Sequence, residues 1–255
     1  MLLIAFPESM ICLRCHPLKS IRIFDVRKLD KEDFCNHMSH RGWAVVRSLH
    51  EDEDQFKKTL NCATEFFSLD KEKKMSSRVL FAEVDHHSSG LSGYNEPHPG
   101  KQLFRIRKGL NQPFPEEPLL FRSTVEDTFE RLERVMAVCC GAVLADCGAE
   151  YSAIVQERDD PPNCNEHVDP GWMTCVVVSG TPGLEVLDAS TGDWLGLEHF
   201  LIPFQHIIVM RSFSEDKYVG AVHRVIRNDR ERMSLVYERR PPTDAEISSQ
   251  KRRRF

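Results

Sequence analysis

The sequence predicts a mainly β fold with flanking α-helices, and three observations support this class. Short runs of β-forming residues follow one another at close spacing from 151 to 237, which is typical of a β-sandwich or barrel. Two longer segments ahead of them, 52–67 and 123–149, carry apolar residues at helical spacing. The length of 255 residues suits one large domain, because β-sandwiches and barrels of roughly 200–250 residues commonly fold undivided.

The N-terminal part of the chain predicts short strands and helices. Residues 1–20 are a leader of uncertain structure, and the alternation in Ile21–Val26 predicts the first strand. A helix is expected over Leu29–Ser39, with Asp30 placed to cap its first turn. Trp43–Val46 then predicts a second strand.

Two helical segments and the stretch between them precede the strand-rich region. Residues 81–100 are rich in His, Ser, Gly and Pro and predict a loop, followed by a strand at Leu103–Arg107. The 123–149 segment is expected to be a scaffold helix that packs along the β core. The apolar positions that should face the core are Phe56, Leu60, Ala63, Phe66 and Phe67 in the first helix and Val125, Phe129, Leu132, Val135, Met136, Cys139, Val143 and Leu144 in the second.

Three residues have the types and spacing of a metal site. His167 and Asp169 are two apart, just ahead of the β-branched run 175–178. Residues i and i+2 of a strand point to the same face, so the imidazole and the carboxylate should converge. His223 opens another strand-like run 54 residues after Asp169. Two histidines and one carboxylate, with positions left open, make up the facial triad of non-haem Fe(II) oxygenases.

A single His-x-Asp is common by chance, so the prediction depends on a second motif downstream. Arg232 and Ser234 are also two apart, in a run that predicts the last strand. A guanidinium binds a carboxylate with two parallel hydrogen bonds, and a neighbouring hydroxyl can add a third. This pair therefore predicts a clamp for a carboxylate beside the metal.

With these motifs, the chain resembles the isopenicillin N synthase-like family of iron-dependent, mostly 2-oxoglutarate-dependent dioxygenases. Pro182–Val186 is similar to the family's Gly-Gly-Leu-Gln-Val turn, and Val222–Val225 is similar to its Glu-His-Arg-Val. Upstream, Arg41–Val46 resembles its His-Gly-Phe-Phe-x-Val strand, and Glu65–Lys73 resembles its helix end Glu-Phe-Phe-x-Leu-Pro-x-Glu-Lys. The likeness covers about Ile21 to Pro242.

The resemblance implies a double-stranded β-helix (jelly roll) core with N-terminal helices packed along it. A single dioxygenase domain over 21–240 would comprise a helical and strand part, 21–150, and the jelly-roll core, 151–240. Residues 241–255 would be a polar, basic tail. The implied function is oxidation, such as hydroxylation, of a small organic molecule, an acid being one option, with Fe(II), 2-oxoglutarate and O2. The implied site consists of the metal ligands His167, Asp169 and His223 and the 2-oxoglutarate contacts Arg232 and Ser234.

Two departures from the family pattern leave alternatives open. The family's Asn-x-Tyr is missing from the strand at 154–158, and the chain after Ser234 is short. One alternative is a catalytically silent jelly-roll protein that binds a ligand. Another is a family-type oxidase that uses no 2-oxoglutarate and binds the carboxylate of its substrate instead.

Five further residues are candidates for the substrate pocket. The family's strand at the position of 103–107 borders that pocket, so Arg105 and Arg107 are candidates for holding an anionic group, although a solvated strand face explains them equally well. Tyr94, Trp172 and Tyr218 are candidates for an apolar wall. Such residues are more often core packing than recognition.

The composition narrows the possible partners. A net charge of -5 argues against nucleic acid and anionic membranes, and no apolar run approaches the roughly 18 residues that span a bilayer. Nine cysteines without an export signal indicate reduced thiols in the cytoplasm, while the basic run 251–254 makes a nuclear location the alternative. The haem-attachment pattern at Cys12–His16 is attributed to chance because such attachment belongs to exported proteins. Oligomeric state is not predicted.

Overall fold

The structure, a computed structural model, places twelve strands and four α-helices within the residues it describes. These residues are 1–6, 21–47, 50–80, 91–98, 101–107, 111–147, 166–169, 171–211, 217–226 and 231–239. The helices are α1 (Lys31–Arg41), α2 (His50–Ser68), α3 (Lys71–Met75) and α4 (Phe121–Cys147). The strands are β1 (Leu2–Phe6), β2 (Ile23–Asp25), β3 (Trp43–Arg47), β4 (Val79–Leu80), β5 (Leu91–His98), β6 (Lys101–Arg105), β7 (Met173–Val177), β8 (Leu184–Leu187), β9 (Trp194–Leu195), β10 (His206–Met210), β11 (His223–Val225) and β12 (Arg232–Arg239).

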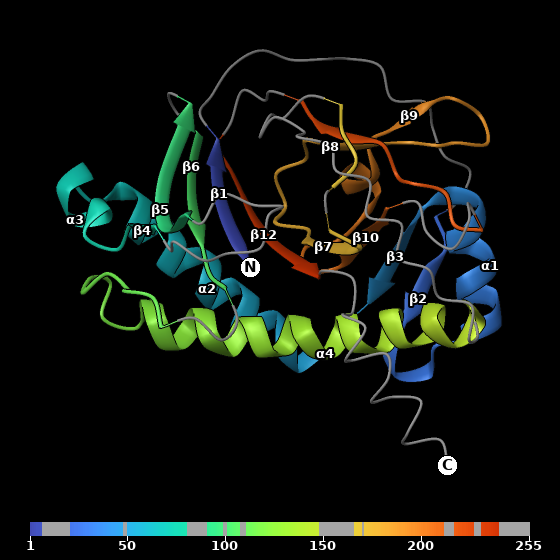
Figure 1. Ribbon diagram of the computed structural model, residues 1–255, viewed down its shortest axis with the longest axis horizontal. Coiled ribbons are helices and arrows are strands. Elements are labelled where there is room, and N and C mark those ends of the chain that lie inside the picture. The colour runs from blue at the N-terminus through green and yellow to red at the C-terminus, as the bar shows by residue number, and fades with distance from the viewer. Residues whose placement is uncertain are drawn as a thin grey trace.

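Two sheets form the β framework (Figure 1). The larger has nine strands in the order β2-β3-β10-β7-β12-β1-β6-β5-β4, and the smaller has the order β11-β8-β9. The paired strands run antiparallel, except for the parallel pair β2-β3. The predicted class of sheets with flanking helices is therefore confirmed, whereas the strand predicted at 151–156 lies outside the described residues.

The first predicted helix is confirmed as α1, two residues later at each end than the predicted Leu29–Ser39, with the expected cap at Asp30. The side chain of Asp30 accepts a hydrogen bond from the backbone N–H of Asp33, which caps α1 at its N-terminus. At the other end, Gly42 has φ 72° and donates its N–H to the carbonyl of Met38. A Cβ at Gly42 would also lie 2.7 Å from the carbonyl oxygen of Val219, so this close turn requires glycine.

The long helix α4 crosses one side of the large sheet, with α1 and α2 packed against it (Figure 1). Its apolar stripe and the facing strands form one buried cluster, in which Phe66, Phe104 and Phe121 are fully buried with ring centroids 4.7–5.2 Å apart. Both long helices are confirmed, each displaced by about two residues from the predicted start. None of the helices in the described ranges combines the length and the apolarity that a bilayer crossing requires.

Three segments of the large sheet, β1, β4 and β5, were not predicted from the sequence. Leu2–Phe6, within the leader, lies between β12 and β6 and pairs with both. Residues 91–98 form β5, so the predicted loop is wrong there. The strand is stabilised by its pairing with β6. The local sequence of β5, which contains Gly and Pro, gives no sign of this pairing.

A second apolar cluster lies between the two sheets and orients β12. It includes Val45, Val176 and Val186, and Val236 of β12 packs against it. Because side chains alternate along a strand, Arg232 and Ser234 share the face of Val236. The carboxylate-clamp pair therefore points into the space between the sheets.

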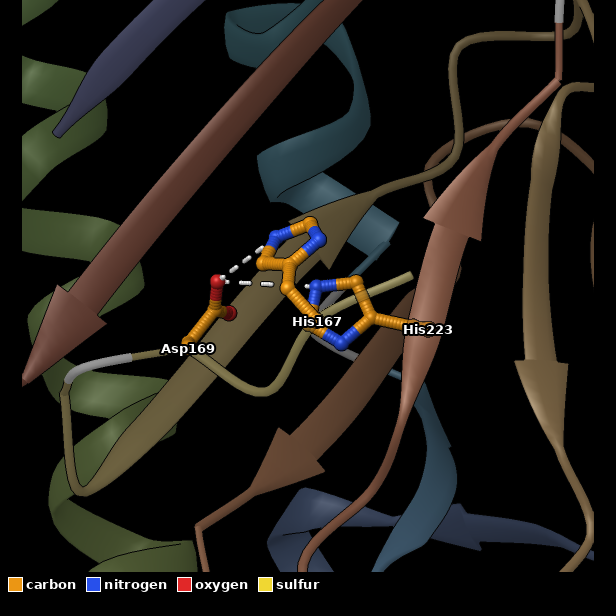
Figure 2. Close-up of side chains that lie close together, drawn as sticks. All are labelled: His167, Asp169 and His223. Carbon is orange, nitrogen blue, oxygen red and sulfur yellow. Dashed lines mark ion pairs between the residues drawn. The ribbon is translucent and has the colours of Figure 1, made fainter. Parts of the chain in front are cut away.

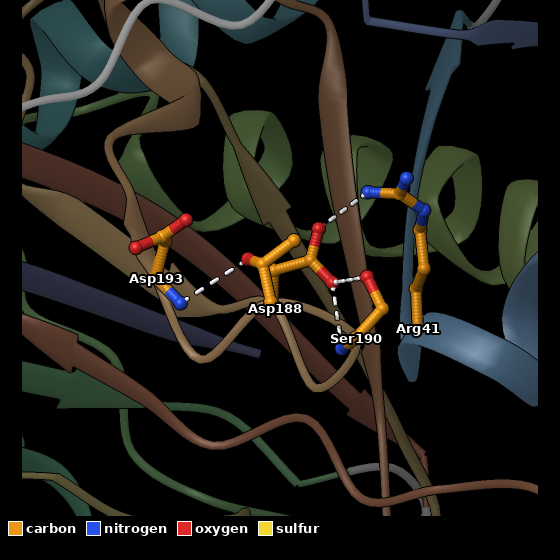
Figure 3. Close-up of polar contacts among 5 residues, drawn as sticks. Arg41, Asp188, Ser190 and Asp193 are labelled. Carbon is orange, nitrogen blue, oxygen red and sulfur yellow. Dashed lines mark hydrogen bonds and ion pairs between the residues drawn. The ribbon is translucent and has the colours of Figure 1, made fainter.

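A polar contact joins the small sheet to α1 (Figure 3). Arg41 donates from Nη1 to Oδ2 of Asp188 at 2.7 Å, and Asp188 is only 3% exposed. The other carboxylate oxygen accepts from the backbone N–H and the hydroxyl of Ser190. This arrangement fixes the turn between β8 and β9.

Candidate metal centre and cosubstrate site

The structure brings His167, Asp169 and His223 together at one point (Figure 2). Nε2 of His167 and Nε2 of His223 each lie 3.5 Å from Oδ1 of Asp169. The two histidines also exchange both backbone hydrogen bonds, at 2.9 Å each, in an isolated β-bridge. That bridge holds the His-x-Asp segment against the start of β11, so the convergence depends on a long-range pairing.

The spacing of the three donor atoms fits a shared metal ion. Atoms that each lie roughly 2.1 Å from one metal, at octahedral or tetrahedral angles, are separated by about 3.0–3.4 Å. The two observed nitrogen–oxygen distances of 3.5 Å are close to this range, and the whole group of donor atoms lies within 4.8 Å. The three side chains thus form a group able to hold one divalent ion.

Hydrogen bonding and charge set the orientation of His223 and the ionisation of Asp169. Nδ1 of His223 lies 3.1 Å from the carbonyl oxygen of Ala221, and in the tautomer that donates this bond the lone pair of Nε2 faces Asp169. Burial lowers the pKa of His223, but the Asp169 carboxylate outweighs burial and raises it. Burial raises the pKa of Asp169, while the interactions with His223 and His167 outweigh it and hold this pKa well below its usual range. Asp169 is therefore an anion at neutral pH.

An ionic network beside the histidines fastens their segments to the small sheet. Arg224 follows His223 and donates from Nε to Glu185 of β8 at 2.7 Å and from Nη1 to Glu166 at 3.0 Å. Its guanidinium carbon lies 3.9 Å from the ring centroid of Trp194 in β9. The Arg224 network, which is Arg224 with Glu185, Glu166 and Trp194, thus links both histidine-bearing segments to β8 and β9.

The predicted clamp residues lie next to each other on β12, and both are buried. Arg232 is 2% exposed and Ser234 is 1% exposed. Within the described part of the chain, the Ser234 hydroxyl has no hydrogen-bond partner, which is unusual for a buried polar atom and fits a site that a ligand completes. A Cβ at Gly183 would lie 2.9 Å from Cδ of Arg232, so the arginine passes directly over this glycine.

One charged residue beside Arg232 was not predicted from the sequence. Glu198, in the 3₁₀ turn η2 (Leu197–Phe200), accepts hydrogen bonds from Nη2 of Arg232 at 3.0 and 3.2 Å. It also accepts the backbone N–H groups of Gly183 and Leu184 at 2.8 Å. The local sequence, Leu197-Glu198-His199-Phe200, carries no motif that connects this glutamate with Arg232.

The aromatic pocket candidates lie in the cluster between the large sheet and the helices. Tyr94, Trp172 and Tyr218 are at most 2% exposed. Tyr94 donates its hydroxyl to Gln102 at 3.0 Å, and Tyr218 donates to Asp146 at 2.6 Å. Both hydroxyls are thus engaged within the protein, and the role of these three residues in a substrate pocket stays a prediction.

The two arginine candidates belong to β6 and its C-terminal end. Arg107 donates from Nε to the hydroxyl of Ser92 and from Nη2 to the carbonyl of Leu91. Arg105 is half-buried in β6, and its carbonyl accepts from Gln112. Arg107 thus supports the β5 edge, and substrate binding by either arginine stays a prediction.

Comparison with known proteins gives one sequence match. No protein-family model matches the chain. The 2-oxoglutarate-Fe(II) type oxidoreductase hxnY of Emericella nidulans is 32% identical over 89 residues, which are 32% of this chain and 26% of hxnY. The chain thus matches about a quarter of the length of this curated relative.

Solved structures resemble the chain over most of its length. A full-length Neurospora crassa protein, crystallised in complex with alpha-KG and 5-formyluracil, has a TM-score of 0.67 at 17% identity, over 87% of this chain and 84% of the Neurospora chain. The rice dioxygenase for auxin oxidation (DAO) has a TM-score of 0.60 at 15% identity, over 92% of this chain and 95% of DAO. The protein therefore has the fold of the 2-oxoglutarate-Fe(II) oxygenases.

Proposed function

We propose that the protein is a non-haem Fe(II)- and 2-oxoglutarate-dependent oxygenase. The convergence of His167, Asp169 and His223 carries this proposal, because it joins two imidazoles and one carboxylate with the spacing of a shared metal ion. The fold shared with 2-oxoglutarate-Fe(II) oxygenases and the local match to hxnY support it.

Each site residue has a separate task in this proposal. The imidazoles offer Nε2 lone pairs, and Asp169 supplies the negative charge that a divalent cation requires. Arg232 and Ser234 bind and orient the far carboxylate of 2-oxoglutarate, since both are buried on the face of β12 that Val236 turns toward the space between the sheets. Bound Fe(II), together with 2-oxoglutarate and O2, supplies the oxidising chemistry.

The substrate we propose is a small organic molecule, with hydroxylation as the expected outcome. The structurally similar Neurospora crassa protein has been crystallised with 5-formyluracil and with thymine, which supports this size class. We also propose a jelly-roll core over 151–240, with 21–240 as one catalytic domain. The unpredicted strand β1 adds Leu2–Phe6 to the sheet of this domain.

The proposal is tested by anaerobic titration of the purified protein with Fe(II) and then with 2-oxoglutarate. We expect stoichiometric iron binding followed by the weak visible charge-transfer band of the chelate. Asp169→Ala and His167→Ala should lose iron binding yet stay folded, because both side chains are more than 20% exposed. His40→Ala, which removes an exposed histidine of α1, is the matched control and should bind iron normally.

The other outcomes separate the alternatives. Iron binding without the band would favour an oxidase that uses Arg232 on a substrate carboxylate. No iron binding would favour a silent binding protein. Iron binding that survives in Asp169→Ala would refute the assignment of the metal ligands.

A further inference from the structure

A buried ion pair already occupies part of the proposed cosubstrate clamp. The side chains of Arg232 and Glu198 are 3% and 1% exposed, and Nη2 of the arginine contacts both carboxylate oxygens. Glu198 is held in place from its other side by the backbone N–H groups of Gly183 and Leu184. Its carboxylate is therefore a fixed part of the fold at this position.

A permanent carboxylate changes what Arg232 can offer to a ligand. A lone buried guanidinium attracts an incoming carboxylate strongly, because the interior screens charge poorly. When Glu198 compensates the arginine, the pair is formally neutral, and an arriving carboxylate is also repelled by the resident one. The clamp still offers hydrogen-bond donors, but Glu198 offsets most of the electrostatic attraction of Arg232 for an incoming carboxylate.

We propose that Glu198 is the counter-charge that sets how strongly this site prefers a cosubstrate with a far carboxylate. This inference rests on the proposed function, since it assumes that Arg232 receives 2-oxoglutarate. Glu198 makes the preference weak in the natural protein, and its neutralisation makes the preference strong.

The variant Glu198→Gln isolates the charge. A glutamine has nearly the same shape, and its amide oxygen can still accept the backbone N–H groups of Gly183 and Leu184. Its NH2 group then takes the position of Oε1, so Arg232 loses both its compensating anion and this acceptor. The unliganded variant is expected to unfold at a lower temperature, because a buried charge has lost its partner.

The chain offers a matched control in Glu185→Gln. Glu185 is a second buried glutamate, 4% exposed, whose carboxylate pairs with Arg224 instead of Arg232. Its neutralisation also removes the buried partner of an arginine, so it reproduces a loss of stability of the same kind, although Arg224 keeps its exposed pair with Glu166. It should not change the charge at Arg232.

The experiment compares two 2-oxo acids by titration calorimetry, with Mn(II) as a redox-inactive metal. 2-Oxoglutarate carries the far carboxylate, and 2-oxovalerate replaces it with a methyl group. The dissociation constant of 2-oxovalerate divided by that of 2-oxoglutarate measures the contribution of the far carboxylate alone. We expect this ratio to rise at least about tenfold in Glu198→Gln, which corresponds to about 1.4 kcal/mol, and to stay unchanged in Glu185→Gln.

An unchanged or lower ratio in Glu198→Gln, with 2-oxoglutarate binding in the natural protein, would overturn the inference and leave the proposed function intact. If both proteins bind Mn(II) and neither binds 2-oxoglutarate, the proposed cosubstrate and the inference both fail. If Glu198→Gln does not fold, Glu198→Asp replaces it in the test. Its shorter side chain moves the carboxylate away from Arg232, so the same ratio should also rise. No rise there would also overturn the inference.

Discussion

Arg224→Met removes the guanidinium that joins both histidine-bearing segments to the small sheet. The arginine donates to Glu185 at 2.7 Å and to Glu166 at 3.0 Å, and it stacks on Trp194. Methionine keeps the unbranched stem of the side chain but cannot donate a hydrogen bond. The variant therefore tests the ionic contacts of this network with little change in apolar packing.

The burial of each partner of Arg224 determines how much the free energy of unfolding falls in this variant. The Glu185 side chain is 5% exposed, and removing the partner of such a charge costs about 3 kcal/mol, near the low end for buried pairs because Arg224 is 28% exposed. The stacking on Trp194 adds about 0.5–1 kcal/mol. Glu166 is 60% exposed, so its pair contributes at most about 1 kcal/mol. The free energy of unfolding should fall by about 3.5–5 kcal/mol, which lowers Tm by roughly 7–20 °C in a domain of this size.

Differential scanning calorimetry of the metal-free protein measures this change. Glu166→Gln is the control and should lower Tm by no more than about 4 °C, because its ion pair is mostly solvated. The double variant Arg224→Met with Glu185→Met should recover part of the loss, since it leaves no buried charge unpaired. A Tm for Arg224→Met no lower than that of Glu166→Gln would refute the reasoning.

Three further predictions concern the clamp, the acid stability and the core. Gly183→Ala would place a Cβ 2.9 Å from Cδ of the buried Arg232 and so should weaken 2-oxoglutarate binding at least about tenfold while sparing metal binding, as calorimetry would show. His206 is fully buried, and burial lowers its pKa from 6.5 to about 4. Between pH 6.5 and 4 the imidazole is therefore protonated in the unfolded chain but not in the folded protein. Stability should therefore fall by about 2–3 kcal/mol between pH 7 and 4.5, and denaturant unfolding of His206→Met should show a smaller fall. Phe66→Ala should cost about 3–5 kcal/mol in the same assay, because the side chain is fully buried among aromatic rings; a loss below about 1 kcal/mol would contradict its place in the core.

Local features of the sequence were enough to predict the three longer helices and the residue types of the candidate site, but not the short helix α3. The helices α1, α2 and α4 were predictable because caps and apolar spacing are set by residues only a few positions apart. The pairs His167-x-Asp169 and Arg232-x-Ser234 were also visible, since a strand orients residues i and i+2 alike. Residue type alone thus indicated a metal and a carboxylate.

Only the tertiary structure decided the contacts that depend on pairing between distant segments. The bridge between His167 and His223 closes the candidate metal centre, and β1 enters the sheet beside β12. The pairing of Arg232 with Glu198 belongs to the same class, because neither residue carries a local sign of the other. Strand pairing and buried ion pairs depend on the packing of the whole domain, so they cannot be predicted from short-range sequence patterns.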